Sequence, residues 1–96
     1  MKGKERSYLK GLANPLKAKI QVGKAGLSPE FFDQLEVLLD HEELVKINVL
    51  KNAPVEAREI KEEILETTGA EFVSQLGKKL VIYRPSKDDP KIELPQ

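Results

Sequence analysis

The sequence predicts an α/β domain with a mixed four-stranded sheet packed with helices. Two observations predict it. Segments of helical and of two-residue hydrophobic periodicity alternate along most of the chain, and two short apolar segments joined by a tight turn close it. The resulting order of elements is α-β-α-β-α-β-β. Because 96 residues leave room for one core, we expect residues 1–96 to form a single domain.

The first helix and the first strand are short. A helix is predicted at residues 3–12, where three apolar side chains fall on one side. Asn14 ends it, because the residue before a proline is disfavoured in the helical conformation. Residues 18–22 then alternate between apolar and polar side chains, which is typical of a strand.

The second helix has the clearest start signal in the chain. The Ser28 hydroxyl can cap the exposed amides, and Pro29 suits the first helical position. One apolar stripe follows at helical spacing, formed by Phe31, Phe32, Leu35, Leu38 and Leu39. Residues 44–50 alternate again and predict a second strand.

A third helix and a hairpin complete the predicted domain. The helix is predicted to open at Asn52-Ala53-Pro54 and to end at Thr68, with Gly69 as a left-handed cap. Residues 71–76 and 79–84 are predicted strands, joined tightly at Gly77-Lys78. After Pro85, the Pro, Ser and Asp content of residues 86–96 predicts a loose tail.

The side-chain pattern of the strands predicts how the sheet is covered. The last strand is apolar in both phases, which indicates a central or covered position. The first two strands carry a polar phase, formed by Lys19, Gln21, Lys46 and Asn48. We therefore expect part of one sheet face to be open to solvent.

Charge is distributed in blocks, although the net charge is zero. Residues 1–24 carry a net charge of +6, residues 25–74 carry −8, and residues 75–84 carry three basic side chains and no acid. Opposed blocks create an electrostatic dipole, one pole of which can meet an anion. The acidic block is also what the solvated faces of two helices would contain.

The segment Gly23-Lys24-Ala25-Gly26 is the principal candidate site. It lies between a strand and a helix N-terminus, where glycines permit close approach of the backbone and amides point outward. Lys24 adds a mobile charge, so the loop could hold a phosphate oxygen, as the GxxG loop of KH domains does. A plain structural turn would have the same pattern. The longer glycine pattern and Lys-Ser/Thr ending of a nucleotide-binding P-loop are missing.

Two further basic groups are candidates for phosphate contacts. One is Lys78 and Lys79 at the hairpin, followed by Arg84 at the end of the last strand. The other is the N-terminal run of Lys2, Lys4, Arg6, Lys10, Lys17 and Lys19, in which Arg6 and Lys10 share a helix face. Lysines that only keep the surface soluble are the alternative explanation for both groups.

The residue inventory favours no catalytic chemistry. The sequence has no cysteine and one histidine, His41, and no serine has a histidine placed to activate it. We therefore expect no enzymatic activity, no metal and no cofactor. No apolar segment approaches the roughly 20 residues of a membrane-spanning helix, so we expect a cytoplasmic monomer without a membrane partner.

The order of elements and several motifs resemble a family. The motifs are Ile20-Gln21-Val22-Gly23-Lys24-Ala25-Gly26-Leu27-Ser28, His41-Glu42-Glu43-Leu44-Val45-Lys46, Thr68-Gly69-Ala70, Gly77-Lys78-Lys79-Leu80-Val81-Ile82-Tyr83-Arg84 and Ile92-Glu93-Leu94-Pro95. With them, the chain resembles the bacterial single-domain CRM proteins of the YhbY type over residues 4–95. No position that defines the pattern departs from it.

The resemblance implies both a fold and a function. The fold would be similar to the C-terminal domain of bacterial translation initiation factor three, with an additional helix. The function would be RNA binding through the GxxG loop, in precursors of the large ribosomal subunit, as an assembly factor. The predicted RNA contacts are Gly23, Lys24, Ala25, Gly26, Lys19, Lys78, Lys79, Arg84, Lys2, Lys4, Arg6, Lys10 and Lys17. A protein-interaction module that uses the acidic helices or the basic patch is the alternative.

Overall fold

The computed structural model describes residues 1–54 and 56–95, and it has the predicted order of elements. These elements are α1 (Gly3–Ala13), β1 (Ile20–Val22), α2 (Pro29–Glu42), β2 (Leu44–Val49), α3 (Ala57–Thr68), β3 (Glu71–Leu76) and β4 (Lys79–Tyr83). The strands form one sheet in the order β1-β2-β4-β3. β1 is parallel to β2, whereas β4 is antiparallel to both β2 and β3. The predicted mixed four-stranded α/β fold is confirmed.

Two predicted boundaries were wrong by two residues or more, whereas the ends of α1, β2 and β4 differ by one. β1 begins at Ile20 rather than at residue 18. α3 begins at Ala57, not at Asn52-Ala53-Pro54. The segment before α3 instead makes a turn, in which the Ala53 amide donates to the Leu50 carbonyl oxygen at 3.1 Å. Pro54 faces the loop after β1, so this segment has a tertiary role that local propensity does not indicate.

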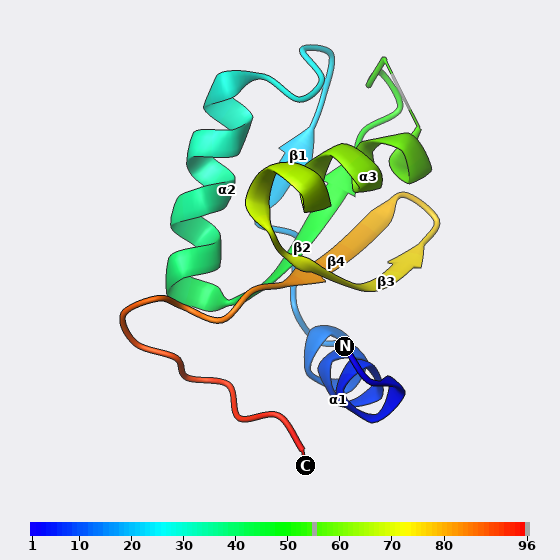
Figure 1. Cartoon of the computed structure of the whole chain (residues 1–96). Helices are drawn as coiled ribbons and strands as arrows, with labels where there is room; N and C mark the ends of the chain where they lie inside the picture. The colour runs from blue at the N-terminus through cyan, green and yellow to red at the C-terminus, as the bar shows by residue number, and fades with distance from the viewer. Residues whose placement is uncertain (55, 96) are drawn as a thin grey trace.

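α2 and α3 cover one face of the sheet and enclose the larger core (Figure 1). Its buried members are Ile20, Val22, Phe31, Leu35, Leu39, Val45, Ile47, Val49, Ile60, Ile64, Ala70, Leu80 and Ile82. The Ser28 hydroxyl caps α2 as predicted, accepting the Phe31 amide at 3.2 Å. Gly69 ends α3 with φ of 73°, which confirms the left-handed cap.

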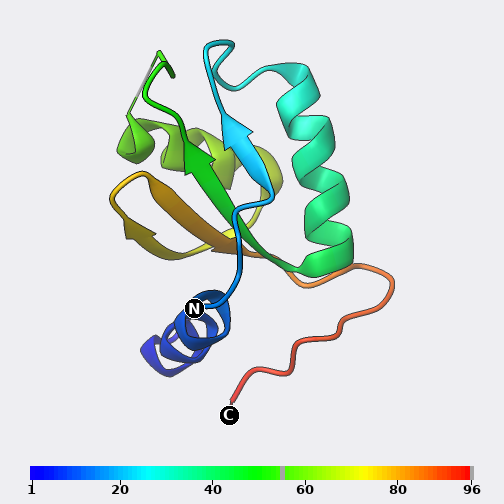
Figure 2. The same ribbon diagram turned by 180° about the vertical axis from the view of Figure 1, so that it is seen from behind.

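α1 covers only part of the opposite face. Its buried side chains, Leu9 and Ala13, join a smaller core with Leu44, Val73, Val81 and Tyr83. Viewed from behind, α1 lies at the end of the sheet away from the β1–α2 loop (Figure 2). Lys46 and Asn48 are therefore only partly covered and Gln21 is exposed, which confirms a partly open face. The central position of β4 between β2 and β3 also agrees with its apolar pattern.

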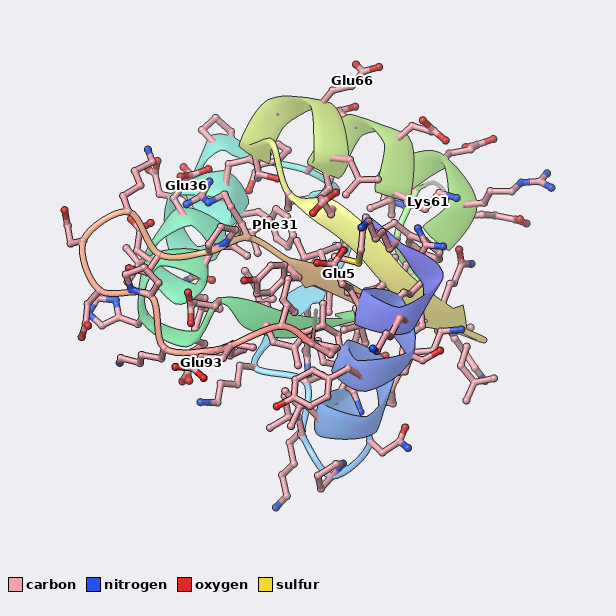
Figure 3. The ribbon with its side chains drawn as sticks, turned by 60° about the horizontal axis from the view of Figure 1, so that its bottom comes forward. Glu5, Phe31, Glu36, Lys61, Glu66 and Glu93 are labelled. Atoms are coloured by element: carbon pink, nitrogen blue, oxygen red, sulfur yellow. The ribbon has the colours of Figure 1, made fainter. Side chains whose placement is uncertain are left out.

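The tail after β4 is irregular, but it makes specific contacts. Residues 86–95 contain no helix or strand. The buried carboxylate of Glu43 accepts the amides of Ser86, Lys91 and Ile92 at 2.7, 2.8 and 2.8 Å. Ile92 and Leu94 pack against the smaller core. The tail thus passes the end of α2 and turns back towards α1 (Figure 3), held more firmly than its composition predicts; Gln96 lies outside the described residues.

Candidate nucleic-acid interface

The loop of residues 23–26 forms a tight turn that presents Lys24 to solvent. The Gly26 amide donates to the Gly23 carbonyl oxygen at 3.0 Å, and Gly26 has a φ of 69°. A Cβ atom on Gly26 would lie 3.2 Å from Cγ of Pro54. Glycine is therefore favoured here both by the backbone conformation and by the contact with Pro54. Lys24 and Ala25 are exposed at the tip.

The start of α2 supplies less to an anion than the sequence indicates. Its exposed amides and positive dipole end point towards the loop. The Ser28 hydroxyl already accepts the Phe31 amide, Pro29 has no amide hydrogen, and Glu30 adds a carboxylate in the first turn. Lys24 and the loop backbone are therefore the main groups available to a phosphate at this position.

The β3–β4 turn lies at the same end of the sheet as the loop. Val22, the last residue of β1, is in register with Val49, whose amide donates to the Lys78 carbonyl oxygen at 2.8 Å. Gly77 has a φ of 59°, which allows the two-residue turn, and Lys78 and Lys79 are exposed. The fold thus brings two of the predicted basic groups to one edge.

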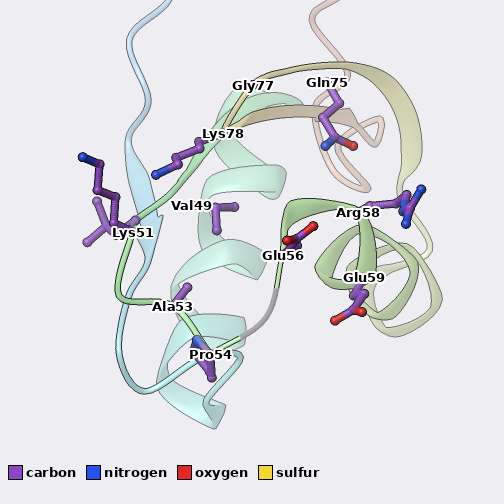
Figure 4. A pocket seen from close by; sticks show the side chains of 11 residues that line it. Val49, Lys51, Ala53, Pro54, Glu56, Arg58, Glu59, Gln75, Gly77 and Lys78 are labelled. Carbon is purple, nitrogen blue, oxygen red and sulfur yellow. The ribbon is translucent and has the colours of Figure 1, made fainter.

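A hollow of about 620 Å³ lies at this edge of the sheet (Figure 4). Its charged lining comprises three cations, Lys51, Arg58 and Lys78, and two carboxylates, Glu56 and Glu59. The sequence analysis did not identify Lys51 and Arg58 as site residues. Neither lies in a cluster of basic residues along the chain, and Arg58 belongs to an acidic helix. Only the fold places them beside Lys78.

Lys19 and Arg84 do not lie with the loop, contrary to the predicted grouping. Lys19 precedes β1, at the opposite end of that strand from residues 23–26, and its amine forms an ion pair with Glu42. Arg84 follows β4, so it too lies at the end of the sheet away from the β3–β4 turn. Its side chain is only 11% exposed.

The Arg84 guanidinium is bound to α2 and to the end of α3. Nη1 lies 3.0 Å from the Glu36 carboxylate and donates to the Thr68 carbonyl oxygen at 2.9 Å. Nη2 lies 3.0 Å from the Asp40 carboxylate. A guanidinium that is already bound to two carboxylates and a carbonyl has little left to offer a phosphate, so Arg84 is a structural residue.

The N-terminal basic run forms a second, separate group. Lys2, Lys4, Arg6 and Lys10 lie in or at the start of α1, and Lys17 lies in the connection to β1. Arg6 is partly buried, and its Nε donates to the Phe72 carbonyl oxygen at 3.3 Å. Lys2, Lys10 and Lys17 are exposed, but α1 holds its part of the run away from the edge that carries residue 24.

The ionisable groups whose pKa is shifted lie away from the basic edge. Burial would raise the pKa of Glu43, but the amides of Ser86, Lys91 and Ile92 outweigh it and lower that pKa. A hydrogen bond from Lys19 lowers the pKa of Glu42, and burial raises the pKa of Tyr83. In the part of the chain that the structure describes, no three His, Cys, Asp or Glu side chains are grouped as metal ligands.

Together these features define a small α/β domain whose sheet ends in a basic loop-and-turn edge. A family model described as the CRS1 / YhbY (CRM) domain matches residues 1–84, and the chain belongs to this family. It is 31% identical to the Bacillus subtilis protein named "Probable RNA-binding protein YqeI" over 93 residues, which cover 97% of each chain. A Haemophilus influenzae protein named "RNA-binding protein" is 36% identical over 93 residues, covering 97% of this chain and 93% of that protein.

A solved structure is similar to this chain in both fold and sequence. The chain superposes on the solution structure of SAV1595 from Staphylococcus aureus, a candidate RNA-binding protein, with a TM-score of 0.82. The sequences are 37% identical, and the match covers 99% of both chains. Among residues 1–54 and 56–95, no helix has the length and apolar character needed to cross a membrane.

Proposed function

We propose that this protein binds structured RNA through the basic edge formed by residues 23–26 and the β3–β4 turn. The observation that carries the proposal is that Lys51, Arg58 and Lys78, scattered in the sequence, line one hollow at the end of the sheet. The loop that carries Lys24 lies at the same end, because Val22 pairs with Val49 and Gly26 faces Pro54. RNA-binding names among the relatives support the same assignment.

Recognition by this edge would rest on phosphates and shape. The chain contains three phenylalanines and two tyrosines, of which Tyr83 is buried and Tyr8 is 43% exposed on α1. Stacking of several bases on an aromatic sheet surface, as in RRM domains, therefore has no counterpart here. Lysine and arginine contacts to the backbone position RNA with little sequence preference.

Within this function, we propose that the RNA is rRNA in precursors of the large ribosomal subunit, and that the protein acts as a non-catalytic assembly factor. The family resemblance of the motifs supports this target. The residue inventory supports the absence of catalysis, since it offers no nucleophile with a base beside it.

Lys24→Glu is expected to weaken binding to a hairpin RNA about tenfold at low salt, because one phosphate contact is lost and a repulsion is added. The slope of log Kd against log salt should fall by about one. Both are measured by fluorescence anisotropy across a salt series. Lys87→Glu, an exposed lysine in the tail, is the control and should leave the affinity near wild type. Equal affinities for the two variants would contradict the loop assignment.

The ribosomal target is tested with native protein in a sucrose gradient of cell lysate. Co-sedimentation with large-subunit precursors, weakening as salt rises, is the expected result. Migration only at the top of the gradient, at low and at moderate salt, would contradict it.

A protein-docking role is the second candidate, favoured by the exposed carboxylates of α2 and α3, such as Glu66, which points away from the sheet (Figure 3). RNase treatment separates the two functions. Association with ribosomal particles should vanish if RNA is the partner, and it should survive if the acidic helices bind a protein.

A further inference from the structure

The uncovered half of the sheet face that carries α1 adjoins the basic edge. Strand register defines a row across this face from Gln21 through Asn48 and Lys79 to Leu76. A second row runs from Lys46 through Val81 to Ser74. The smaller core contains Val81 but none of the other members of these rows, so α1 leaves this half of the face largely open.

These rows line a second hollow, of about 410 Å³, which is within the ~300–1,000 Å³ range of small-ligand pockets. Its lining comprises Ala13, Asn14, Lys46, Asn48, Ser74, Leu76, Lys78, Lys79 and Val81. Three of these residues are lysines, three offer neutral hydrogen-bonding groups, and none is acidic. The Lys46 amine donates to the Leu16 carbonyl oxygen at 2.9 Å.

Leu76 is the largest of the three apolar residues that line this hollow, the others being Ala13 and Val81. It is 85% exposed at the end of β3, the most exposed of the large hydrophobic side chains among the described residues. A leucine side chain makes no favourable contact with a phosphate, but it can pack against the apolar face of a base. The lining therefore matches both parts of a nucleotide: anionic phosphate and flat base.

Lys78 joins the two hollows. It lines the hollow at the sheet edge with Lys51 and Arg58, and also the hollow on the open face with Lys46 and Lys79. An RNA strand bound at the edge would therefore reach the open face over the β3–β4 turn, with Lys78 in contact with both parts.

We propose that the open face binds an unpaired nucleotide next to the structured RNA held at the edge. The base lies against Leu76 and hydrogen-bonds to Asn48 or Ser74, and its phosphates face Lys46 and Lys79. An unpaired nucleotide fits because the hollow is concave and partly apolar, whereas a duplex presents phosphates on a convex surface and keeps its bases stacked. This inference rests on the proposed RNA-binding function and specifies the RNA: structured, with an unpaired extension.

The test compares two RNA probes, a blunt hairpin and the same hairpin extended by a short run of unpaired uridines. Wild type should bind the extended hairpin several-fold more tightly than the blunt one. Leu76→Ser should weaken binding to the extended hairpin about fivefold, the equivalent of roughly 1 kcal/mol of apolar contact, and leave the blunt hairpin unaffected. Val37→Ser removes another exposed aliphatic side chain, 57% exposed on α2, and is the matched control.

The outcomes separate the two proposals. Equal binding of both probes by wild type, with Lys24→Glu still weakening both, would overturn the open-face site and leave the edge intact. Unchanged affinity of Leu76→Ser for the extended hairpin would also overturn it. Failure of wild type to bind either probe would remove the RNA-binding proposal itself. Because Leu76 is so exposed, its replacement should leave the thermal unfolding midpoint near wild type.

Discussion

Replacing Glu43 with alanine is expected to lower the free energy of unfolding by about 3 kcal/mol, a large effect for a single side chain. The carboxylate is fully buried and accepts three backbone amides from the tail. Alanine would leave these amides without an acceptor, and it would release the segment that covers part of the smaller core. Glu43 also has a φ of 65°, which is unfavourable for any residue other than glycine. Alanine would keep this backbone strain, so it would not offset the lost hydrogen bonds.

The same interaction predicts a dependence on pH. The pKa of Glu43 in the folded protein lies below its ordinary value of 4.5, so the native state favours the ionised carboxylate. Its contribution is therefore fully present above about pH 4.5 and is lost as the pH falls through the lower native value. Wild type should lose stability with acidification in this range more steeply than Glu43→Gln.

Denaturant unfolding across a pH series measures both effects. Glu42→Gln is the matched control, because it removes the neighbouring carboxylate, which is exposed and bound only to Lys19 among the contacts described. An exposed ion pair contributes ~0–1 kcal/mol, so this variant should stay close to wild type at neutral pH. A Glu43→Ala loss no larger than that of Glu42→Gln would show that the tail is not anchored by this carboxylate.

The elements of this fold could be predicted because their signals are local. Ser28 and Pro29 mark the start of α2, Gly69 marks the end of α3, and two-residue alternation marks β2. The predicted start of α3 was wrong. Pro54 fits the local sequence preference for a helix start, but in the structure it precedes the helix and faces Gly26. The tail was expected to be loose because its composition could not reveal that a carboxylate distant in sequence accepts its amides.

The candidate site could be predicted only where its members are close in sequence. Lys24 and Lys78 each lie in a glycine turn, which made them recognisable. Lys51 and Arg58 have no such context, and they become part of the edge only through the packing of the β2–α3 segment. The direction of each strand explains why two predicted members of the site lie elsewhere. Lys19 precedes β1 and Arg84 follows β4, so both lie at the other end of the sheet from the glycine turns.

Arg84 and Arg58 lie at opposite ends of the sheet, and their surroundings differ in the same way. Arg84 connects β4 to α2 and to the last turn of α3, whereas Arg58 is exposed in the first turn of α3 at the basic edge. A pair of identical substitutions, Arg84→Met and Arg58→Met, can therefore distinguish a stability role from a binding role. Methionine keeps the length of the side chain but removes its charge and hydrogen bonds.

Arg84→Met is expected to lower the free energy of unfolding by about 2 kcal/mol. Removing one partner of a buried ion pair costs roughly 3–5 kcal/mol, but Glu36 and Asp40 are 41% and 46% exposed, so water compensates part of the loss. Its affinity for hairpin RNA, measured well below its unfolding midpoint, should equal that of wild type.

Arg58→Met should show the reverse: stability within about 0.5 kcal/mol of wild type, as for most exposed substitutions, and RNA affinity reduced several-fold with a smaller salt dependence. The two measurements together locate the RNA. If Arg84→Met weakened binding while it remained folded and Arg58→Met did not, the RNA would lie at the opposite end of the sheet, where α2 ends. The edge formed by residues 23–26 and the β3–β4 turn would then be a structural feature rather than the binding surface.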